Sequence, residues 1–262
     1  MIYDSHIHTE FSADSEMRIA EALAEAGTQG YGLVLTEHFD PDYPGDWVFE
    51  FSPEDYWAAY ESLRGRDDDL SSGLSLGVEC GMMPDHAEVL RDFIARAPFD
   101  QVIGSIHILD NGDIYEKDYY PGRDKDRVFT RYYTVMAEMV RENPFIDTLA
   151  HIDYICRVAP YDNPGLEYER YHEYIDEILR ALVETDTAME INTRRFGDKA
   201  VLDELAPVYR RFRQLGGRMV TVGSDAHTPD RVGLNIRTAV DFAESMELVP
   251  VTFRNRKAVK LC

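Results

Sequence analysis

The sequence alternates between short runs rich in β-branched residues and longer segments with helical periodicity, and this alternation restricts the possible folds most. About seven strand–helix units follow one another. The expected strands lie near Ile2 to His6, Tyr31 to Thr36, Leu74 to Glu79, Gln101 to His107, Thr148 to His151, Ala188 to Asn192 and Met219 to Ser224. This order is typical of an α/β fold with a mostly parallel sheet, either closed as a barrel or open and doubly wound.

Four of the segments between these strands carry clear helix signals. "PEDYWAAYESLRG" has a proline at its start and a glycine at its end, and "DRVFTRYYTVMAEMVREN" stops before Pro144. "EYERYHEYIDEILRALVE" is periodic, and "AVLDELAPVYRRFRQLGG" is expected to bend at Pro207 and to end at its two glycines. No linker or low-complexity stretch divides the sequence, so we expect one domain over residues 1–262.

Charge and composition exclude several classes of partner. The chain has 49 Asp and Glu against 27 Lys and Arg, a formal net charge of −22, which disfavours binding to long nucleic acid or to anionic lipid. No apolar run approaches the roughly 18 residues that a membrane span requires. Cys80, Cys156 and Cys262 are widely spaced and form no CxxC pair, which favours reduced thiols without an assigned role. We therefore expect a cytoplasmic protein without a membrane partner, whose oligomeric state the sequence leaves open.

Imidazole and carboxylate side chains gather at the expected carboxyl ends of the strands. They are Asp4, His6 and His8 in "DSHIH", Glu37 and His38 in "LTEHFD", Glu79 in "GVECG", His107 in "GSIHIL", His151 and Asp153 in "LAHIDY", Glu190 in "MEINTRR", and Asp225 and His227 in "VGSDAH". These ends share one face of a parallel barrel, so we expect the side chains to surround one cavity. Imidazole nitrogens combined with carboxylate oxygens suit Zn²⁺, Mn²⁺ or Fe²⁺.

Several residues near these ends have other expected roles. Asp4 is expected to orient a ligand histidine. Glu37 and Asp153 are expected either to support ligands in the same way or to lie in solvated loops, and Glu190 either to hold an arginine or a substrate amine or to be structural. Outside the strand ends, His172 is expected on a helix surface, and His86 has no assigned role.

The motif series "DSHIHTEFSAD", "LTEHFD", "GVECG", "GSIH", "AHIDY" and "GSDAH" resembles the PHP (polymerase and histidinol phosphatase) superfamily, most closely its histidinol-phosphate phosphatases. The motifs follow the order of that family from residue 4 to residue 227. The resemblance implies a distorted (β/α)₇ barrel that holds three divalent transition-metal ions, Zn, Mn or Fe, at its carboxyl face. It also implies a metal-dependent phosphatase.

The resemblance further implies which residues bind each ion. The first ion would take His6, His8, Glu79 and Asp225; the second would share Glu79 and add His107 and His151; the third would take Asp14, His38 and His227. Two ions about 4 Å apart and bridged by Glu79 would turn a shared water into hydroxide, and the third would hold the phosphate oxygens.

Cations other than the metals are expected to complete the catalytic site. Arg157 follows the fifth expected strand, and Arg194 and Arg195 follow the sixth, so all three are candidates to bind phosphate and stabilise the transition state. The proton for the leaving alcohol could come from a metal-bound water, Asp225 or Glu190, and the sequence does not decide among them.

Two long loops, "HFDPDYPGDWVFEFS" and "LDNGDIYEKDYYPGRDKD", are expected to act as lids or binding loops. Acidic loop residues together with Tyr43, Trp47 and Tyr161 are expected to surround a cationic amino alcohol such as histidinol phosphate. The predicted reaction is therefore hydrolysis of L-histidinol phosphate. Alternatives are phosphatases of nucleotides or other small monoesters, a non-catalytic metal-binding module, and an amidohydrolase, although no lysine ends a strand as the carbamate bridge of such enzymes would require.

Overall fold

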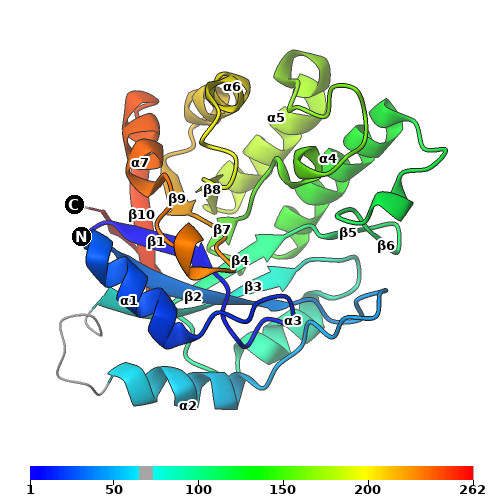
Figure 1. Cartoon of the computed structure of the whole chain (residues 1–262). Coiled ribbons are helices and arrows are strands. Elements are labelled where there is room, and N and C mark those ends of the chain that lie inside the picture. The colour runs from blue at the N-terminus through cyan, green and yellow to red at the C-terminus, as the bar shows by residue number, and fades with distance from the viewer. Residues whose placement is uncertain (65–72, 262) are drawn as a thin grey trace.

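A mostly parallel sheet forms the centre of the computed structural model, which describes residues 1–64 and 73–261 (Figure 1). Within this part of the chain its strands follow the order β1 (Tyr3–Ile7), β2 (Gly32–Phe39), β3 (Leu74–Gly81), β4 (Gln101–Ser105), β7 (Thr148–Leu149), β8 (Ala188–Asn192), β9 (Met219–Gly223), β10 (Val249–Arg254) and β11 (Lys257–Lys260). Neighbouring strands are parallel from β1 to β10, and only β10 and β11 are antiparallel. The seven expected strands are confirmed.

Two of the strands end two residues earlier than the sequence predicts. β4 ends at Ser105 and β7 at Leu149, so His107 and His151 each lie two residues beyond a strand. Between them, a small hairpin of β5 (Ile108–Leu109) and β6 (Gly112–Asp113) forms inside the long loop after β4.

Helices cover the outer face of the sheet (Figure 1). They are α1 (Ile19–Gln29), α2 (Pro53–Arg64), α3 (Ala87–Ile94), α4 (Lys125–Glu142), α5 (Tyr168–Glu184), α6 (Lys199–Leu215) and α7 (Ile236–Ser245). The four predicted helices are confirmed: α4 ends just before Asn143 and Pro144, and α6 runs through Pro207 to a left-handed Gly216 (φ 109°). No helix among the described residues is long and apolar enough to cross a membrane.

β1, at one edge of the sheet, and β9, the neighbour of β8 and β10, approach each other without forming a ladder. A single parallel bridge joins Ile7 to Ala226, and two backbone hydrogen bonds flank it, from the Asp225 N–H to the His6 carbonyl and from the His8 N–H to the Ala226 carbonyl (both 2.8 Å). A closed barrel is therefore not confirmed within the described residues. We call this junction the β1–β9 seam.

The chain ends in a hairpin of β10 and β11 that its sequence pattern did not predict. Its turn places Asn255 (φ 48°) and Arg256 (φ 63°) in the left-handed region without a glycine, so the usual hairpin signal is absent. The Asn255 N–H donates to Asp100 Oδ1 (2.8 Å), and Arg256 Nε donates to Asp147 Oδ2 (2.5 Å). These contacts fix the hairpin against the segments that precede β4 and β7.

The helices bury aromatic residues against the sheet, and Phe212 of α6 is one of them, with 1% of its surface exposed. We expect Phe212→Ala to lower the free energy of unfolding by about 3–5 kcal/mol, because the substitution removes buried apolar surface and leaves a cavity. Urea unfolding at a fixed metal concentration measures this loss. Tyr174→Ala, at an aromatic that is 39% exposed, is the control and should cost about 0.5 kcal/mol or less. Equal losses in both variants would contradict this view of the core.

Candidate metal centre

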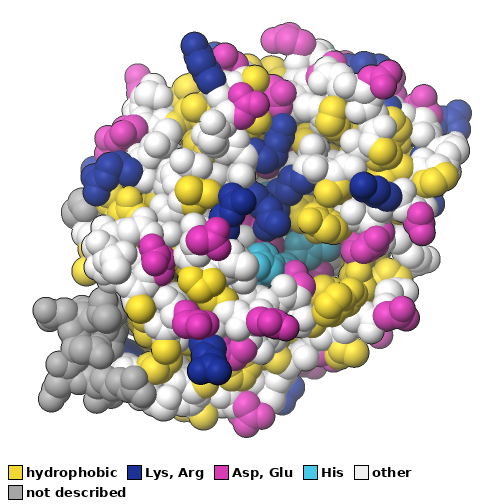
Figure 2. Space-filling view, viewed as in Figure 1, with side chains coloured by type: hydrophobic (Ala, Val, Ile, Leu, Met, Phe, Trp, Pro, Cys, Tyr) yellow, Lys and Arg dark blue, Asp and Glu magenta, His cyan; other side chains and the backbone are white. Residues whose placement is uncertain are grey.

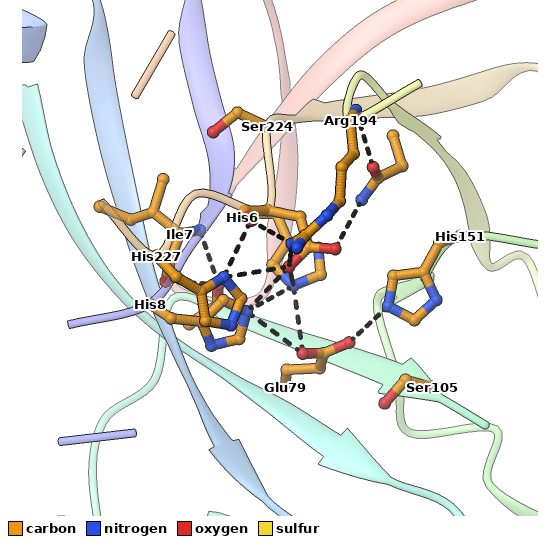
Figure 3. Close-up of polar contacts among 12 residues, drawn as sticks. His6, Ile7, His8, Glu79, Ser105, His151, Arg194, Ser224 and His227 are labelled. Carbon is orange, nitrogen blue, oxygen red and sulfur yellow. Dashed lines mark hydrogen bonds and ion pairs between the residues drawn. The ribbon is translucent and has the colours of Figure 1, made fainter. Parts of the chain in front are cut away.

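The structure brings the predicted imidazoles and carboxylates together at the carboxyl ends of the strands (Figure 3). His6 belongs to β1, His38 to β2 and Glu79 to β3, whereas the remaining members follow strands. These members are His8 after β1, His107 after β4, His151 after β7, and Asp225 and His227 after β9. Apart from His227, all of them are buried.

Glu79 lies at the centre of this cluster. Its Oε1 is 2.9 Å from His151 Nε2 and 3.4 Å from His107 Nε2. Its Oε2 is 3.1 Å from His6 Nε2 and 3.4 Å from His8 Nε2, yet this buried oxygen has no hydrogen-bond partner with suitable geometry among the described residues. The two carboxylate oxygens therefore face different imidazoles, which is the arrangement that a bridging ligand requires.

Two imidazole nitrogens also face each other, since His6 Nε2 and His8 Nε2 are 3.0 Å apart. Asp225 Oδ1 lies 3.5 Å from His8 Nε2 and 4.0 Å from His6 Nε2. Nitrogen and oxygen atoms that converge in a buried space are the donor set of a divalent transition metal. The residues present therefore fit a metal ion here.

Asp14, His38 and His227 form a second, more open part of the cluster. Asp14 Oδ2 is 3.1 Å from His227 Nε2 and 3.6 Å from His38 Nε2. The ring of His8 stacks on those of His38 and His227, at centroid distances of 4.0 and 4.3 Å. His38 also turns Nδ1 toward Glu79 Oε2 (3.1 Å), so it connects the two parts of the cluster.

The electrostatics of the cluster favour a bound cation. Burial opposes a charge on His6, but Glu190 and Glu79 outweigh it and raise the pKa of this imidazole well above its usual range. Burial also disfavours the charged Glu79 carboxylate, yet the neighbouring imidazoles, first His6, lower its pKa well below its usual range. Burial and then His38 lower the pKa of His8. The carboxylate field that attracts a proton would equally attract a metal ion.

Glu190 supports this cluster and does not line the cavity, and the contacts found for it match the structural one of its two expected roles. His6 Nδ1 donates to its Oε1 (2.6 Å), and the His151 N–H donates to its Oε2 (2.8 Å). One buried carboxylate thus orients the imidazole of His6 and holds the backbone of His151. The pairing leaves the Nε2 atom of His6 facing Glu79.

The hydrogen bonds found for the Asp4 carboxylate come from backbone N–H groups and from Ser224 Oγ, whereas the sequence predicted contact with the imidazole of a ligand histidine. The Asp4 carboxylate accepts hydrogen bonds from the N–H and Oγ of Ser224 (2.8 and 2.5 Å), from the Gly233 N–H (2.8 Å) and from the His6 N–H (3.4 Å). These contacts hold the segment after β9 against β1 at the β1–β9 seam. They therefore set the distance between His6 and Asp225.

Glu37 holds the loop after β1 through hydrogen bonds. This matches the first of its two expected roles, the support of a ligand residue. Thr9 donates to it through both its N–H (2.8 Å) and its Oγ1 (2.5 Å), and Ser12 Oγ donates as well (2.6 Å). Ser12 Oγ also lies 3.2 Å from His8 Nδ1. Glu37 therefore positions His8 through Ser12.

The three predicted arginines separate into two groups. Arg157 and Arg194 line the cavity above the cluster, whereas Arg195 turns away, bound to Asp153 (2.8 Å) and to Glu204 (3.3 Å). The expected contact of Arg195 with the cavity is not seen, because Asp153 holds its guanidinium.

The cavity itself has about 350 Å³ and is lined on one side by the two loops that the sequence singles out. Tyr43 and Trp47 come from the first loop, and Asp113 and Glu116 from the second; Tyr43 Oη donates to Asp113 Oδ2 (2.6 Å) and links the loops. Tyr161 does not line the cavity. In Figure 2 histidine side chains are visible in a hollow bordered on one side by Lys or Arg side chains. One end of the cavity is therefore cationic and the other acidic and aromatic.

Sequence reasoning missed two residues of this site, Asp40 and Tyr154. The Asp40 carboxylate accepts a hydrogen bond from His107 Nδ1 (2.7 Å), and its position two residues after His38 was a usable signal. The ring of Tyr154 lies beside those of His107 and His151, at centroid distances of 5.0 and 4.8 Å. It follows β7 in a 3₁₀ turn that the sequence pattern does not reveal.

The other notable histidines and cysteines lie outside the cluster. His172 is exposed on α5, as predicted, and His86 precedes α3 and contacts Asp42 (3.1 Å). Cys80 and Cys156 are buried free thiols, and Cys262 lies outside the described residues.

Comparison with known proteins gives concordant matches. A family model described as the PHP domain matches residues 4–194. The chain is 41% identical to a probable histidinol-phosphatase of Clostridium acetobutylicum and 30% identical to a histidinol-phosphatase of Lactococcus lactis, over 98% of each chain in both cases. A crystal structure of histidinol phosphate phosphatase from Lactococcus lactis, complexed with zinc, L-histidinol and phosphate, superposes with a TM-score of 0.93 at 29% identity and covers 99% of both chains.

We expect Glu79→Gln to lower the metal content of the purified protein and to abolish hydrolysis, because the amide cannot bridge two cations as a carboxylate does. Elemental analysis by mass spectrometry measures the metal bound per chain. Glu54→Gln, at an exposed glutamate that pairs with Arg96, is the matched control and should retain full metal content. A Glu79→Gln protein with unchanged metal content and activity would contradict the bridging role.

Proposed function

The chain belongs to the PHP-domain family, and on this premise we propose that it hydrolyses L-histidinol phosphate to L-histidinol and phosphate. It is a metal-dependent phosphoric monoester hydrolase. Its small-molecule substrate enters the cavity that lies over the cluster of imidazoles and carboxylates. The reaction belongs to the biosynthesis of histidine.

One observation carries the assignment of the phosphate position. The Arg157 side chain is 7% exposed and donates through one guanidinium nitrogen to Asp225 Oδ2 (2.6 Å), whereas its Nε and second terminal nitrogen are buried without a partner in the part of the chain that the structure describes. Burial opposes the charge on Arg157, but Asp225 and then Asp153 raise its pKa, so the group stays cationic. Buried unpaired N–H donors in a cavity favour an anion such as phosphate.

The residues of the cluster would hold the metal ions beside this arginine. We propose three ions: His6, His8, Glu79 and Asp225 would hold the first, Glu79, His107 and His151 the second, and Asp14, His38 and His227 the third. When bound, such ions generate a nucleophile from water near neutral pH and neutralise the charge of the phosphate. All of these ligands except Asp14 belong to four overlapping groups whose ligand atoms lie within 4.8 Å of one another, although the groups divide the residues differently, and this supports a site for several ions. Asp14 Oδ2 is 3.1 Å from His227 Nε2 and 3.6 Å from His38 Nε2.

The chain's own residues orient the substrate and stabilise the transition state. Arg157 and Arg194 lie beside Asp225 at the cationic end of the cavity, where they would bind the equatorial oxygens of the phosphate as charge develops. Asp225 would hold the Arg157 guanidinium in place, and it is one of the candidates to deliver the proton that the leaving alkoxide requires.

The opposite end of the cavity suits the organic part of the substrate. Asp113 and Glu116 would attract the positive charge of an amino alcohol, and Tyr43 and Trp47 would contact its aromatic ring. The distribution of charge in the cavity thus matches a molecule with phosphate at one end and a cation at the other.

Further expectations belong to the same proposal. The bridge and hydrogen bonds at the β1–β9 seam support a distorted (β/α)₇ barrel formed by one domain over residues 1–262. The buried free thiols support a cytoplasmic location, and the net charge of −22 argues against long nucleic acid as a partner.

The substrate preference can be measured directly. We expect phosphate release from histidinol phosphate to exceed that from nucleoside monophosphates and from an aryl phosphate by at least about tenfold in kcat/KM, or roughly 1.4 kcal/mol of transition-state preference. The reason is that only histidinol phosphate carries a cation for the acidic end of the cavity. Steady-state kinetics on the protein with its metals quantified measures the three values. A preference for a nucleotide would replace the proposed substrate.

The role of Arg157 gives a second kinetic test. We expect Arg157→Lys to lower kcat/KM by at least about tenfold, because a lysine keeps the charge but lacks the planar fork that reaches both Asp225 and phosphate. Arg195→Lys is the matched control: its partners Asp153 and Glu204 lie away from the cavity, so it should change kcat/KM by less than about threefold. Equal losses in the two variants would refute the assignment of phosphate to Arg157.

A further inference from the structure

Asp40 lies directly after β2, with 3% of its surface exposed, and is absent from the predicted ligand set. His107 Nδ1 donates to its Oδ1 at 2.7 Å. The carboxylate can only accept here, so Nδ1 carries a proton; in the neutral imidazole that binds a metal, Nε2 then has the free lone pair, and it faces Glu79 Oε1 at 3.4 Å. The carboxylate thus fixes which nitrogen of His107 faces the metal centre.

The second oxygen of Asp40 points to another histidine of the cluster. Oδ2 is buried and lacks a hydrogen-bond partner within residues 1–64 and 73–261, and it lies 3.6 Å from Nδ1 of His38. Asp40 therefore lies between His107 and His38, which belong to two different proposed ion sites. The Asp40 N–H donates to the Phe49 carbonyl (2.9 Å), which holds its backbone in this position.

Gly81 of β3 is a second observation on the position of the Asp40 carboxylate, which occupies the space where a side chain at residue 81 would lie. In the pairing of β2 with β3, His38 lies opposite Glu79 and Phe39 opposite Cys80, which brings Asp40 next to Gly81. A Cβ atom added at Gly81 would overlap the Asp40 carboxylate. A side chain at position 81 would therefore force the Asp40 carboxylate or the adjoining backbone to shift, and we expect this shift to disturb the contact with His107.

We propose that Asp40 is a positioning residue of the metal centre, which orients His107 for the metal ion, and that Gly81 provides the space this requires. The proposal rests on the metal-dependent function described above. A carboxylate that accepts the second ring N–H of a ligand histidine fixes the ring and makes the other nitrogen more basic. Loss of such a partner typically weakens metal binding by about 10–100-fold.

The experiment compares zinc binding to the full chain carrying Asp40→Ala, Asp40→Asn or Gly81→Ala. Each protein is stripped with a chelator and titrated with zinc against a chromophoric competitor, which gives a dissociation constant for each ion. We expect Asp40→Ala and Gly81→Ala to raise one dissociation constant by about 10–100-fold. Asp40→Asn should have a smaller effect, because its amide oxygen still accepts the proton of His107 Nδ1.

Asp42→Asn is the matched control, since Asp42 lies two residues further along the same loop, is exposed and contacts only His86 among the partners found for its carboxylate. Its zinc affinities should equal those of the wild type. Nitrogen NMR of ¹⁵N-histidine-labelled, zinc-loaded protein gives a second measurement. Its His107 signal would not change if Asp40 only stabilised the fold. The signal of a protonated Nδ1 at His107 should persist in Asp40→Asn and be lost in Asp40→Ala.

Two results would overturn the inference: wild-type zinc affinity in both Asp40→Ala and Gly81→Ala, or an unchanged His107 signal in Asp40→Ala. The test is separate from that of the substrate. If zinc binding weakens as expected while the wild type fails to hydrolyse histidinol phosphate, the role of Asp40 stands and the proposed substrate fails.

Discussion

The burial of Glu79 among imidazoles is the interaction on which the rest of the site depends. A fully buried carboxylate is costly unless cations or hydrogen-bond donors compensate it. Here His6, His107, His151 and other ring nitrogens surround both of its oxygens, and one of these oxygens still lacks a hydrogen bond. A bound metal ion would compensate that charge in a way that neutral imidazoles cannot. The buried negative charge of Glu79 therefore explains both why the imidazoles surround it and why we propose metal ions beside it.

Supporting carboxylates surround this centre, and each acts on a different part of it. Glu190 fixes the imidazole of His6, Asp40 that of His107, and Asp4 the backbone at the β1–β9 seam. A ligand ring that is held through its second nitrogen cannot rotate away when its ion exchanges. The excess of acid in the sequence thus has two parts, a solvated surface and a small buried set that organises the site.

The sequence predicted where a side chain lies in the fold when that side chain is at, or just after, the carboxyl end of a strand. Glu79, His107 and His151 converge as expected, because the carboxyl ends of parallel strands share one face. Pairing between side chains could not be predicted in this way. Arg194 and Arg195 both follow β8, so the same position was expected for both from the sequence. Arg195 nevertheless donates to Asp153, because the loops after β7 and β8 pack against each other. The C-terminal hairpin escaped prediction because its turn has no glycine.

The β1–β9 seam has a consequence for how the protein folds. His6 belongs to β1 and Asp225 follows β9, so one proposed ion would take ligands from both ends of a chain segment more than two hundred residues long, where only one backbone bridge joins the strands. Metal binding would then hold β1 against the segment that follows β9. Metal binding and the association of β1 with the segment after β9 would then be one coupled equilibrium. Removal of the metal with a chelator would lower the stability of the β1–β9 seam.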